Sequence, residues 1–461
     1  MVTIQRLCVG LCVASALIRE VRGQVPVADS APTLEQRIEQ LEAREAHHQR
    51  TIAELQRQLR SGDASNWLDE QRAEEVRNIV LDVLADADGR VSLLQDAATA
   101  GWDNGFFIRS ADGNFALRTL GQIQFRYVYS MQDNSPSDDH RAGFEHHRIR
   151  VGLKGHIVDP TWNYFIWSGW DSSGTSLILD AFLKKGLGNG WSVQAGQFKS
   201  EAWREWTVTE MKLQFVERSL IDARYAVSYT QGVALEYVND DLRVNLQLHD
   251  GIRTRATAFS VPPGPSSALY QASNEYAFGV RAEYKLHGAW PDYGDWEGWT
   301  GGDGLAVIGG SLYVQEGESG TTDEENDLVQ WSLDASLKWD GASLFAAVIG
   351  TSVDDDAAVD RDEFAFLIQG GCFLADDLEI MARYEYGDLD GAGGVAGDDL
   401  SILTLGVSRY WARHALKWTT DLGYAFEPVD DAWGGAGRGW RGDAAGEDGQ
   451  IVIRSQFNLL F

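Results

Sequence analysis

Residues 451–461 read IVIRSQFNLLF, and this C-terminal stretch decides between the folds open to the chain. In an extended strand, alternate side chains point to opposite faces, so the odd-numbered positions form a mainly apolar face and the even-numbered positions a mainly polar one. An apolar strand at the end of a soluble protein would be a template for aggregation. In a membrane β-barrel, lipid covers the apolar face and the first strand covers the free edge. An inner strand of a β-sandwich is the alternative that this stretch alone leaves open.

The same two-sided alternation recurs through the preceding part of the chain, with apolar side chains on one face and Arg, Lys, Gln or Glu on the other. The clearest segments are 117–129, 148–157, 242–249, 278–286, 329–339, 378–386 and 416–426. Sandwich strands average about five or six residues, whereas a tilted strand needs about ten to cross a membrane. We therefore predict an all-β transmembrane β-barrel over residues 101–461. It should have about 16 antiparallel strands, with about eighteen as the nearest even alternative, and should enclose water.

Four segments precede the predicted barrel. Residues 1–23 combine an early basic residue with a short apolar run and small residues, which is typical of a secretory signal peptide. After a linker over 24–32, a heptad pattern over 33–60 predicts an N-terminal α-helical coiled coil, with an ordinary amphipathic helix as the alternative. Residues 61–100 are predicted to form a helical connector. No apolar run in the chain is long enough to cross a membrane as a helix.

The formal net charge of −30 is concentrated in what we expect to be long loops. These are residues 291–304, 316–327, 354–363, 388–399 and 430–448. One end of the barrel should carry these loops and the other end short turns. A divalent-cation site and a simply solvated loop are both open interpretations, and no segment has the spaced oxygen ligands of a defined calcium loop.

Basic and amide side chains on the polar strand faces are the main candidates for a functional surface. If that face lines the lumen, a ring of charge would select ions by sign. Pairing with carboxylates such as Asp180 and Glu283 across the barrel is the alternative. The predicted pore-lining residues are Arg118, Gln122, Gln124, Arg126, Arg148, Arg150, Lys154, Arg243, Arg281 and Lys285.

Residues 197–231 form a stretch that is too long for a turn and is rich in Trp and in charges of both signs. Long loops within compact folds are usually functional. We predict that this stretch folds into the barrel and narrows the channel, with an extracellular lid outside the pore as the alternative. The predicted constriction residues are Lys199, Arg204, Lys212, Arg218 and Arg224.

Catalytic arrangements are scarce in this sequence. In the run Glu145-His146-His147, neighbouring strand residues point to opposite faces, so the two imidazoles cannot chelate one ion together. The sequence has no Gly-x-Ser-x-Gly elbow and no His-Glu-x-x-His pair. We therefore predict no enzyme activity, no cofactor and no metal site. A hydrolase assembled from distant residues is the remaining alternative.

Several short motifs resemble the phosphate-selective porin O and P family. In chain order they are Gly105-Phe106-Phe107-Ile108, Asp112-Gly113-Asn114-Phe115, Gly121-Gln122-Ile123-Gln124-Phe125-Arg126, Arg148-Ile149-Arg150, Gly196-Gln197-Phe198-Lys199 and Glu217-Arg218-Ser219. The terminal Phe461 agrees with this resemblance, and the helical preface is similar to that of family members from Planctomycetes-like bacteria. The resemblance implies a trimeric outer-membrane channel of about sixteen strands, whose third loop folds inward and whose lumen can carry a basic ladder for anions. The chain departs from the family pattern at Ser200-Glu201-Ala202-Trp203 and at Tyr229-Thr230-Gln231-Gly232, so phosphate specificity does not transfer with the fold.

Together these patterns predict an outer-membrane porin for passive diffusion of small hydrophilic solutes, with anions or phosphate as the finer expectation. The alternative is a structural outer-membrane protein that tethers the envelope through its coiled coil and has a largely closed barrel. The expected partners are small hydrophilic solutes or anions, outer-membrane lipid, the outer-membrane assembly machinery and further copies in a homotrimer, with no nucleic acid. The N-terminal region should be periplasmic, and Phe457, Leu459 and Phe461 should form the assembly signal.

Overall fold

The computed structural model describes residues 46–47, 49–53, 98–103, 105–132, 140–170, 174–252, 273–319, 324–355, 360–392, 394, 396–444, 447 and 449–461. The chain divides into two compact units, residues 1–90 and 91–461. In the first unit, the described residues belong to a short helix within the predicted coiled coil. The predicted signal peptide and linker, and most of the coiled coil and connector, lie outside the described residues. None of the helices described is long and apolar enough to cross a membrane.

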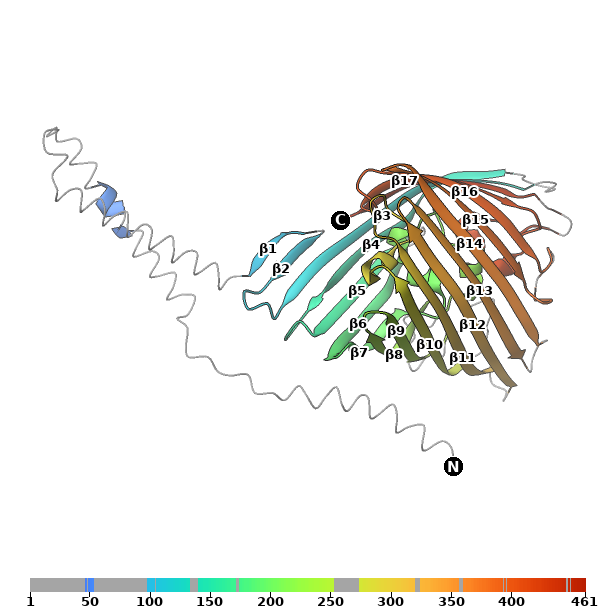
Figure 1. Ribbon diagram of the computed structural model, residues 1–461, viewed down its shortest axis with the longest axis horizontal. Helices are drawn as coiled ribbons and strands as arrows, with labels where there is room; N and C mark the ends of the chain where they lie inside the picture. The colour runs from blue at the N-terminus through green and yellow to red at the C-terminus, as the bar shows by residue number, and fades with distance from the viewer. Residues whose placement is uncertain are drawn as a thin grey trace, which may run out of the picture. The chain divides into compact units, whose positions relative to one another are not determined.

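Sixteen antiparallel strands form a closed barrel in the second unit (Figure 1). Their bounds are β3 Ala116–Met131, β4 His140–His156, β5 Trp162–Trp170, β6 Ser176–Gly188, β7 Trp191–Lys199, β8 Tyr229–Val238, β9 Leu242–His249, β10 Ser273–His287, β11 Leu305–Ser319, β12 Glu324–Trp339, β13 Ala342–Asp355, β14 Arg361–Ala375, β15 Leu378–Asp388, β16 Leu400–Tyr410, β17 Leu416–Ala425 and β18 Ile451–Leu460. Each strand pairs with the next along the chain, and β18 pairs with β3 to close the ring. The predicted strand number and antiparallel barrel are confirmed.

A short hairpin precedes the ring. It consists of β1 (Thr99–Trp102) and β2 (Phe106–Arg109), and β2 pairs with the first residues of β3. The closed ring itself begins at Ala116.

The strands turn their polar faces inward and their apolar faces outward. On β3, Gln122, Gln124 and Arg126 are buried, whereas Ile123 and Phe125 are 38% and 39% exposed. The same alternation buries Arg454, Gln456 and Asn458 of β18 inside the barrel and leaves Phe457 exposed on the outside. A continuous apolar outer band is unfavourable in water and is the surface that lipid covers in a membrane barrel.

The two ends of the barrel differ in the length of their connections. Short connections such as 340–341 and 376–377 lie at the end where β3 begins, which we call the short-turn end. The predicted long loops 316–327, 354–363, 388–399 and 430–448 lie at the opposite, long-loop end. The expectation that residues 291–304 belong with them is wrong, because β10 runs toward the short-turn end. The connection from β10 to β11 therefore falls among the short turns.

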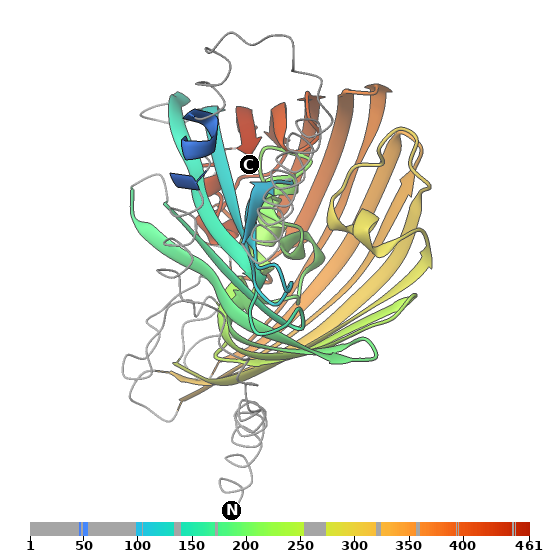
Figure 2. The same ribbon diagram turned by 90° about the vertical axis from the view of Figure 1, so that its left-hand side faces the viewer.

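Residues 200–228, which connect β7 to β8, form an inner segment that folds into the barrel (Figure 2). It contains α4 (Arg204–Thr207), η2 (Glu210–Lys212) and α5 (Leu220–Tyr225). Strands from opposite parts of the ring contact this inner segment: Gln124 of β3 donates to the Glu210 carbonyl, and Ser311 of β11 donates to the Ala202 carbonyl. Only a segment inside the ring can reach both.

The last long loop covers the inner segment from the long-loop end. It contains η4 (Asp431–Trp433) and η5 (Ala436–Arg438). The fully buried Trp433 packs edge-on against Tyr225 of α5, with ring centroids 6.3 Å apart. Arg438 forms an ion pair with Asp222 of α5 at 2.8 Å.

Candidate functional site in the barrel lumen

Local capping explains the shape of the inner segment. Thr209 accepts a hydrogen bond from the Met211 amide and begins η2, and Ser219 accepts one from the Asp222 amide and begins α5. Such side-chain caps satisfy amides that have no partner within a short helix. The turns between the caps place Glu210 and Glu217 on the side of the segment that faces β3 and β4.

Glu210 is the first of two carboxylates around which basic side chains gather. Lys199, at the end of β7, lies 2.9 Å from Glu210, and Arg150 of β4 forms an ion pair with it. Arg218 lies 3.5 Å from the Glu210 carboxylate, and the indole of Trp167 donates to the same carboxylate. All of these charges are shielded from bulk water, where ion pairs are weakened.

Glu217 is the second carboxylate of this kind. Arg126 lies 2.8 Å from it and Arg148 lies 2.9 Å from it, and the ring of His147 also contacts it. Arg126 additionally pairs with Glu145 at 2.5 Å. The two carboxylates therefore attach the inner segment to one side of the barrel wall through buried ion pairs.

The structure brings some of the predicted site residues together and spreads the others along the lumen. Arg126, Arg148, Arg150, Lys199 and Arg218 meet at Glu210 and Glu217. Three others form ion pairs: Arg118 with Asp103, Arg224 with Glu363, and Arg281 with Glu283 and Asp334. Arg243 stacks on the ring of Trp290. The rest donate hydrogen bonds to backbone carbonyls: Lys285 to Gly288, Arg204 to Tyr293, and Gln122 and Gln124 to Glu210. Lys154 and Lys212 have no salt bridge within the described part of the chain.

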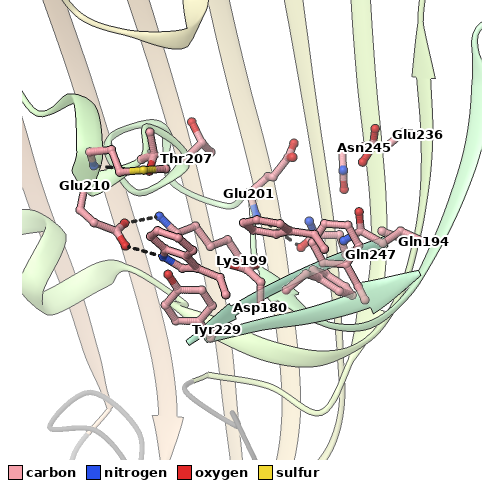
Figure 3. A pocket seen from close by; sticks show the side chains of 17 residues that line it. Asp180, Gln194, Lys199, Glu201, Thr207, Glu210, Tyr229, Glu236, Asn245 and Gln247 are labelled. Atoms are coloured by element: carbon pink, nitrogen blue, oxygen red, sulfur yellow. Dashed lines mark hydrogen bonds and ion pairs between the residues drawn. The ribbon is translucent and has the colours of Figure 1, made fainter. Parts of the chain in front are cut away.

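Two cavities lie beside the inner segment. The first, of about 280 Å³, is enclosed by the segment and by β5 to β9, and is lined by Asp180, Glu201 and Tyr229 among others (Figure 3). The second, of about 350 Å³, shares Glu201, Glu236 and Asn245 with the first and continues toward the short-turn end. The shared lining residues make the two cavities neighbours along one side of the lumen.

The lining of these cavities mixes charges of both signs with amides. The charged and amide residues are Asp180, Lys184, Gln194, Lys199, Glu201, Glu210, Glu236, Arg243, Asn245, Gln247, Arg281 and Glu283. Partial burial, together with the nearby carboxylates of Glu236 and Glu283, raises the pKa of Glu201 to about 7. Its charge therefore changes within the physiological pH range.

A third cavity, of about 580 Å³, opens at the long-loop end. Its lining combines Arg126, Arg141 and His147 with Trp440 and Arg441 of the last loop. The lining of this cavity is therefore mainly basic and aromatic.

Sequence reasoning did not find the segment 288–304 that folds back at the short-turn end. The buried Tyr293 of this segment lies under the guanidinium of Arg204, 3.6 Å from the ring centroid to the carbon of the guanidinium. A possible signal was the aromatic and acidic run WPDYGDWEGW over residues 290–299, which is unusual for a simple solvated turn.

Comparisons with known proteins agree with this architecture. Residues 121–289 match the family model of the phosphate-selective porins O and P, which confirms the resemblance over that range. No curated protein matches the chain.

Solved structures of outer-membrane porins share the fold. An anion-selective porin from Comamonas acidovorans is 14% identical with a TM-score of 0.55, and the match covers 75% of this chain and 100% of the porin. The outer-membrane channel DcaP of Acinetobacter baumannii is 12% identical with a TM-score of 0.51, over 78% of this chain and 100% of the channel. OmpF of Salmonella typhi, in complex with daunomycin, is 12% identical with a TM-score of 0.50, over 78% and 100%. Identities this low show a shared fold and no more.

Proposed function

Starting from a closed barrel whose residues 121–289 match the phosphate-selective porin O and P family, we propose that the protein is an outer-membrane porin. It would let small hydrophilic solutes diffuse down their gradients without covalent chemistry. The observation that carries this proposal is the pair of adjoining, polar-lined cavities beside the inner segment. A barrel with an apolar outer band and such an interior suits passive diffusion.

For the solute, we propose a path with weak charge preference that favours small polar molecules. The basic side chains nearest the inner segment are paired with Glu210 and Glu217, so they serve to hold the segment rather than to attract anions. Lys184 is likewise paired with Glu236 beside the second cavity. A carboxylate partner cancels most of the field that a basic residue offers an entering anion.

An anion preference is the second candidate. The name of the Comamonas porin states such a preference for that protein. In this chain the supporting observation is that Lys154 and Lys212 have no carboxylate partner among the described residues. Unpaired cations near the path would raise the local concentration of anions.

The remaining expectations are also proposals. We place the protein in the outer membrane as a homotrimer with a periplasmic N-terminal region, and assign assembly to Phe457, Leu459 and Phe461. The exposed side chains of all three residues support this assignment. The inner segment supports the envelope-tether alternative, because a segment that occupies the lumen leaves less room for solutes.

Single-channel recording in planar bilayers tests the channel. We expect steady conductance from the full chain, and several-fold higher conductance when residues 203–225 are replaced by a short Gly-Ser linker. A matched control shortens residues 391–397 in an outer loop and should leave conductance unchanged. Conductance from the linker variant but not from the full chain would support the closed-barrel tether. No conductance from either protein would contradict a channel.

The same recordings separate the solute classes. A reversal potential near zero under a salt gradient, with no block by phosphate, supports the weakly charge-selective path. An anion-directed reversal potential with phosphate block, lost in the double variant Lys154→Gln and Lys212→Gln, would favour the anion preference instead.

A further inference from the structure

The segment 288–304, which we call the return segment, folds back into the barrel at the short-turn end. Its η3 (Trp290–Gly294) leads to Trp296, whose ring lies 4.6 Å from that of Phe345 on β13. Trp296 and Glu297 are buried within the barrel mouth. A periplasmic-side connection that is this deeply packed has a structural or binding role beyond joining two strands.

Three potential metal ligands converge at the base of the return segment. Asp295 and Glu297 come from the segment itself, and His414 comes from the connection between β16 and β17. The Nε2 atom of His414 lies 3.0 Å from a Glu297 carboxylate oxygen and 3.6 Å from an Asp295 carboxylate oxygen. Ligands that share a tetrahedral zinc ion at about 2.1 Å lie about 3.4 Å apart, so this spacing suits one ion.

Surrounding donors fix the orientation of both carboxylates. Lys338 lies 2.5 Å from Oδ1 of Asp295, and the Tyr410 hydroxyl donates to Oε1 of Glu297 at 3.1 Å. The other oxygen of each carboxylate, Oδ2 of Asp295 and Oε2 of Glu297, is the one that faces His414. Metal sites hold their ligands through outer hydrogen bonds of this kind.

The imidazole of His414 supplies an independent indication. Its side chain is 7% exposed, Nε2 lies between the two carboxylates, and Nδ1 has no hydrogen-bond partner among the residues that the structure describes. Two carboxylates that face one buried imidazole nitrogen need a proton or a bound cation between them to offset their charge. The rings of Trp299 and Tyr410 pack edge-on against this imidazole.

We propose that Asp295, Glu297 and His414 bind one divalent transition-metal ion of the zinc class. The ligand set of one imidazole and two carboxylates suits zinc, whereas calcium and magnesium prefer six or more oxygen ligands.

The ion would join the return segment to the connection between β16 and β17. Because Tyr293 of this segment contacts Arg204 of the inner segment, metal binding would also stiffen the constriction from below. The inference goes beyond the proposed porin function, and binding can be measured without any channel recording.

Metal titration of the full chain in detergent tests the site. Isothermal titration with Zn²⁺ should give one equivalent bound per chain, and Co²⁺ should give a visible absorption band that Zn²⁺ abolishes. H414Q and D295N should each weaken Zn²⁺ binding by at least about tenfold. The matched control is H287Q, which removes an exposed histidine at the same end of the barrel and should leave binding unchanged.

Two results would overturn the proposal. One is the absence of stoichiometric Zn²⁺ binding to the folded native chain. The other is binding that H414Q and D295N leave unaffected, which would place the ion elsewhere. If neither variant folds, as judged by heat-modifiable migration on gels, the native chain decides: a Co²⁺ band at one equivalent that Zn²⁺ displaces supports the site, and no band contradicts it.

Discussion

Glu201 is one of the two titratable side chains that both inner cavities share, and the other is Glu236. Glu201 lies among Glu236, Glu283, Lys184 and Arg281, and its pKa is raised to about 7 by partial burial and by the two carboxylates. An acid with a raised pKa is neutral below that value and negative above it. The charge of the path should therefore become more negative as pH rises through 7.

This titration gives a prediction about selectivity. Between pH 6 and pH 8 the reversal potential under a salt gradient should shift toward cations, and Glu201→Gln should remove most of the shift. The control is Asp303→Asn, which alters an exposed carboxylate at the short-turn end outside the cavity linings. This variant should retain the shift of the reversal potential between pH 6 and pH 8. An equal pH shift in both variants would show that other groups set the charge of the path.

At the scale of elements, the inner segment is held by buried ion pairs on one side and by apolar packing on the other. Trp203, Ile221 and Tyr225 belong to the apolar cluster inside the barrel, and Glu217 attaches the segment to β3 and β4. Buried ion pairs contribute little net stability, yet the loss of one partner leaves an uncompensated charge. The segment should therefore be more sensitive to loss of a carboxylate than to loss of an exposed pair.

Glu217→Gln tests this sensitivity. It leaves Arg126 and Arg148 without their main buried carboxylate and should lower the free energy of unfolding by roughly 3 kcal/mol. Guanidinium unfolding in detergent, followed by tryptophan fluorescence, measures the change. Glu145→Gln removes a partner of Arg126 that is 34% exposed and should cost less than about 1 kcal/mol. Equal losses in the two variants would contradict the anchoring role of Glu217.

The sequence predicts the existence of the inner segment but not its contacts. Its length and its Trp and charged residues indicate a structured element between two strands. Its partners lie far along the chain: Arg126 is 91 residues from Glu217, and Arg383 is 166 residues from the carbonyl that it binds. Pairing over such separations depends on barrel closure, which residue spacing within one strand does not determine.

At the scale of the whole molecule, closure joins the last residue to the first barrel strand. The amide of Gly121 donates to the Phe461 carbonyl at 2.7 Å, and the Phe461 amide donates to the Gly121 carbonyl at 3.1 Å. A Cβ added at Gly121 would overlap the ring of Phe461. A larger side chain at this position should therefore displace the C-terminal residue from the seam.

Gly121→Leu is expected to lower barrel stability by about 1 to 3 kcal/mol and to reduce the folded fraction in the outer membrane. Heat-modifiable migration on gels measures that fraction. Gly143→Leu in β4 is the control, since nothing lies within 4 Å of a Cβ added there. If both variants assemble equally well, packing of Phe461 on Gly121 has no part in closure.

Strand alternation made the antiparallel barrel predictable, because the side chains of a two-faced sheet repeat every second residue. The return segment was assigned to the wrong end because that assignment depends on whether an even or odd number of strands precedes it. Faint strands such as β5 and β8 leave that number uncertain in the sequence. The proposed metal ligands were missed because they lie far apart along the chain. Asp295 and Glu297 are 119 residues (414 − 295) and 117 residues (414 − 297) from His414.

The inner segment and the return segment enter the lumen from opposite ends and meet where Arg204 contacts Tyr293. The wide mouths of the barrel have a much lower electrical resistance than a thin constricted layer. Nearly all of a voltage applied across the membrane would therefore drop across this meeting point. A unit charge that moves through the whole of a 100 mV difference changes its energy by about 2.3 kcal/mol. The strands would thus experience little of the voltage. Any voltage sensing would reside in the inner segment and the return segment, which are not part of the barrel wall.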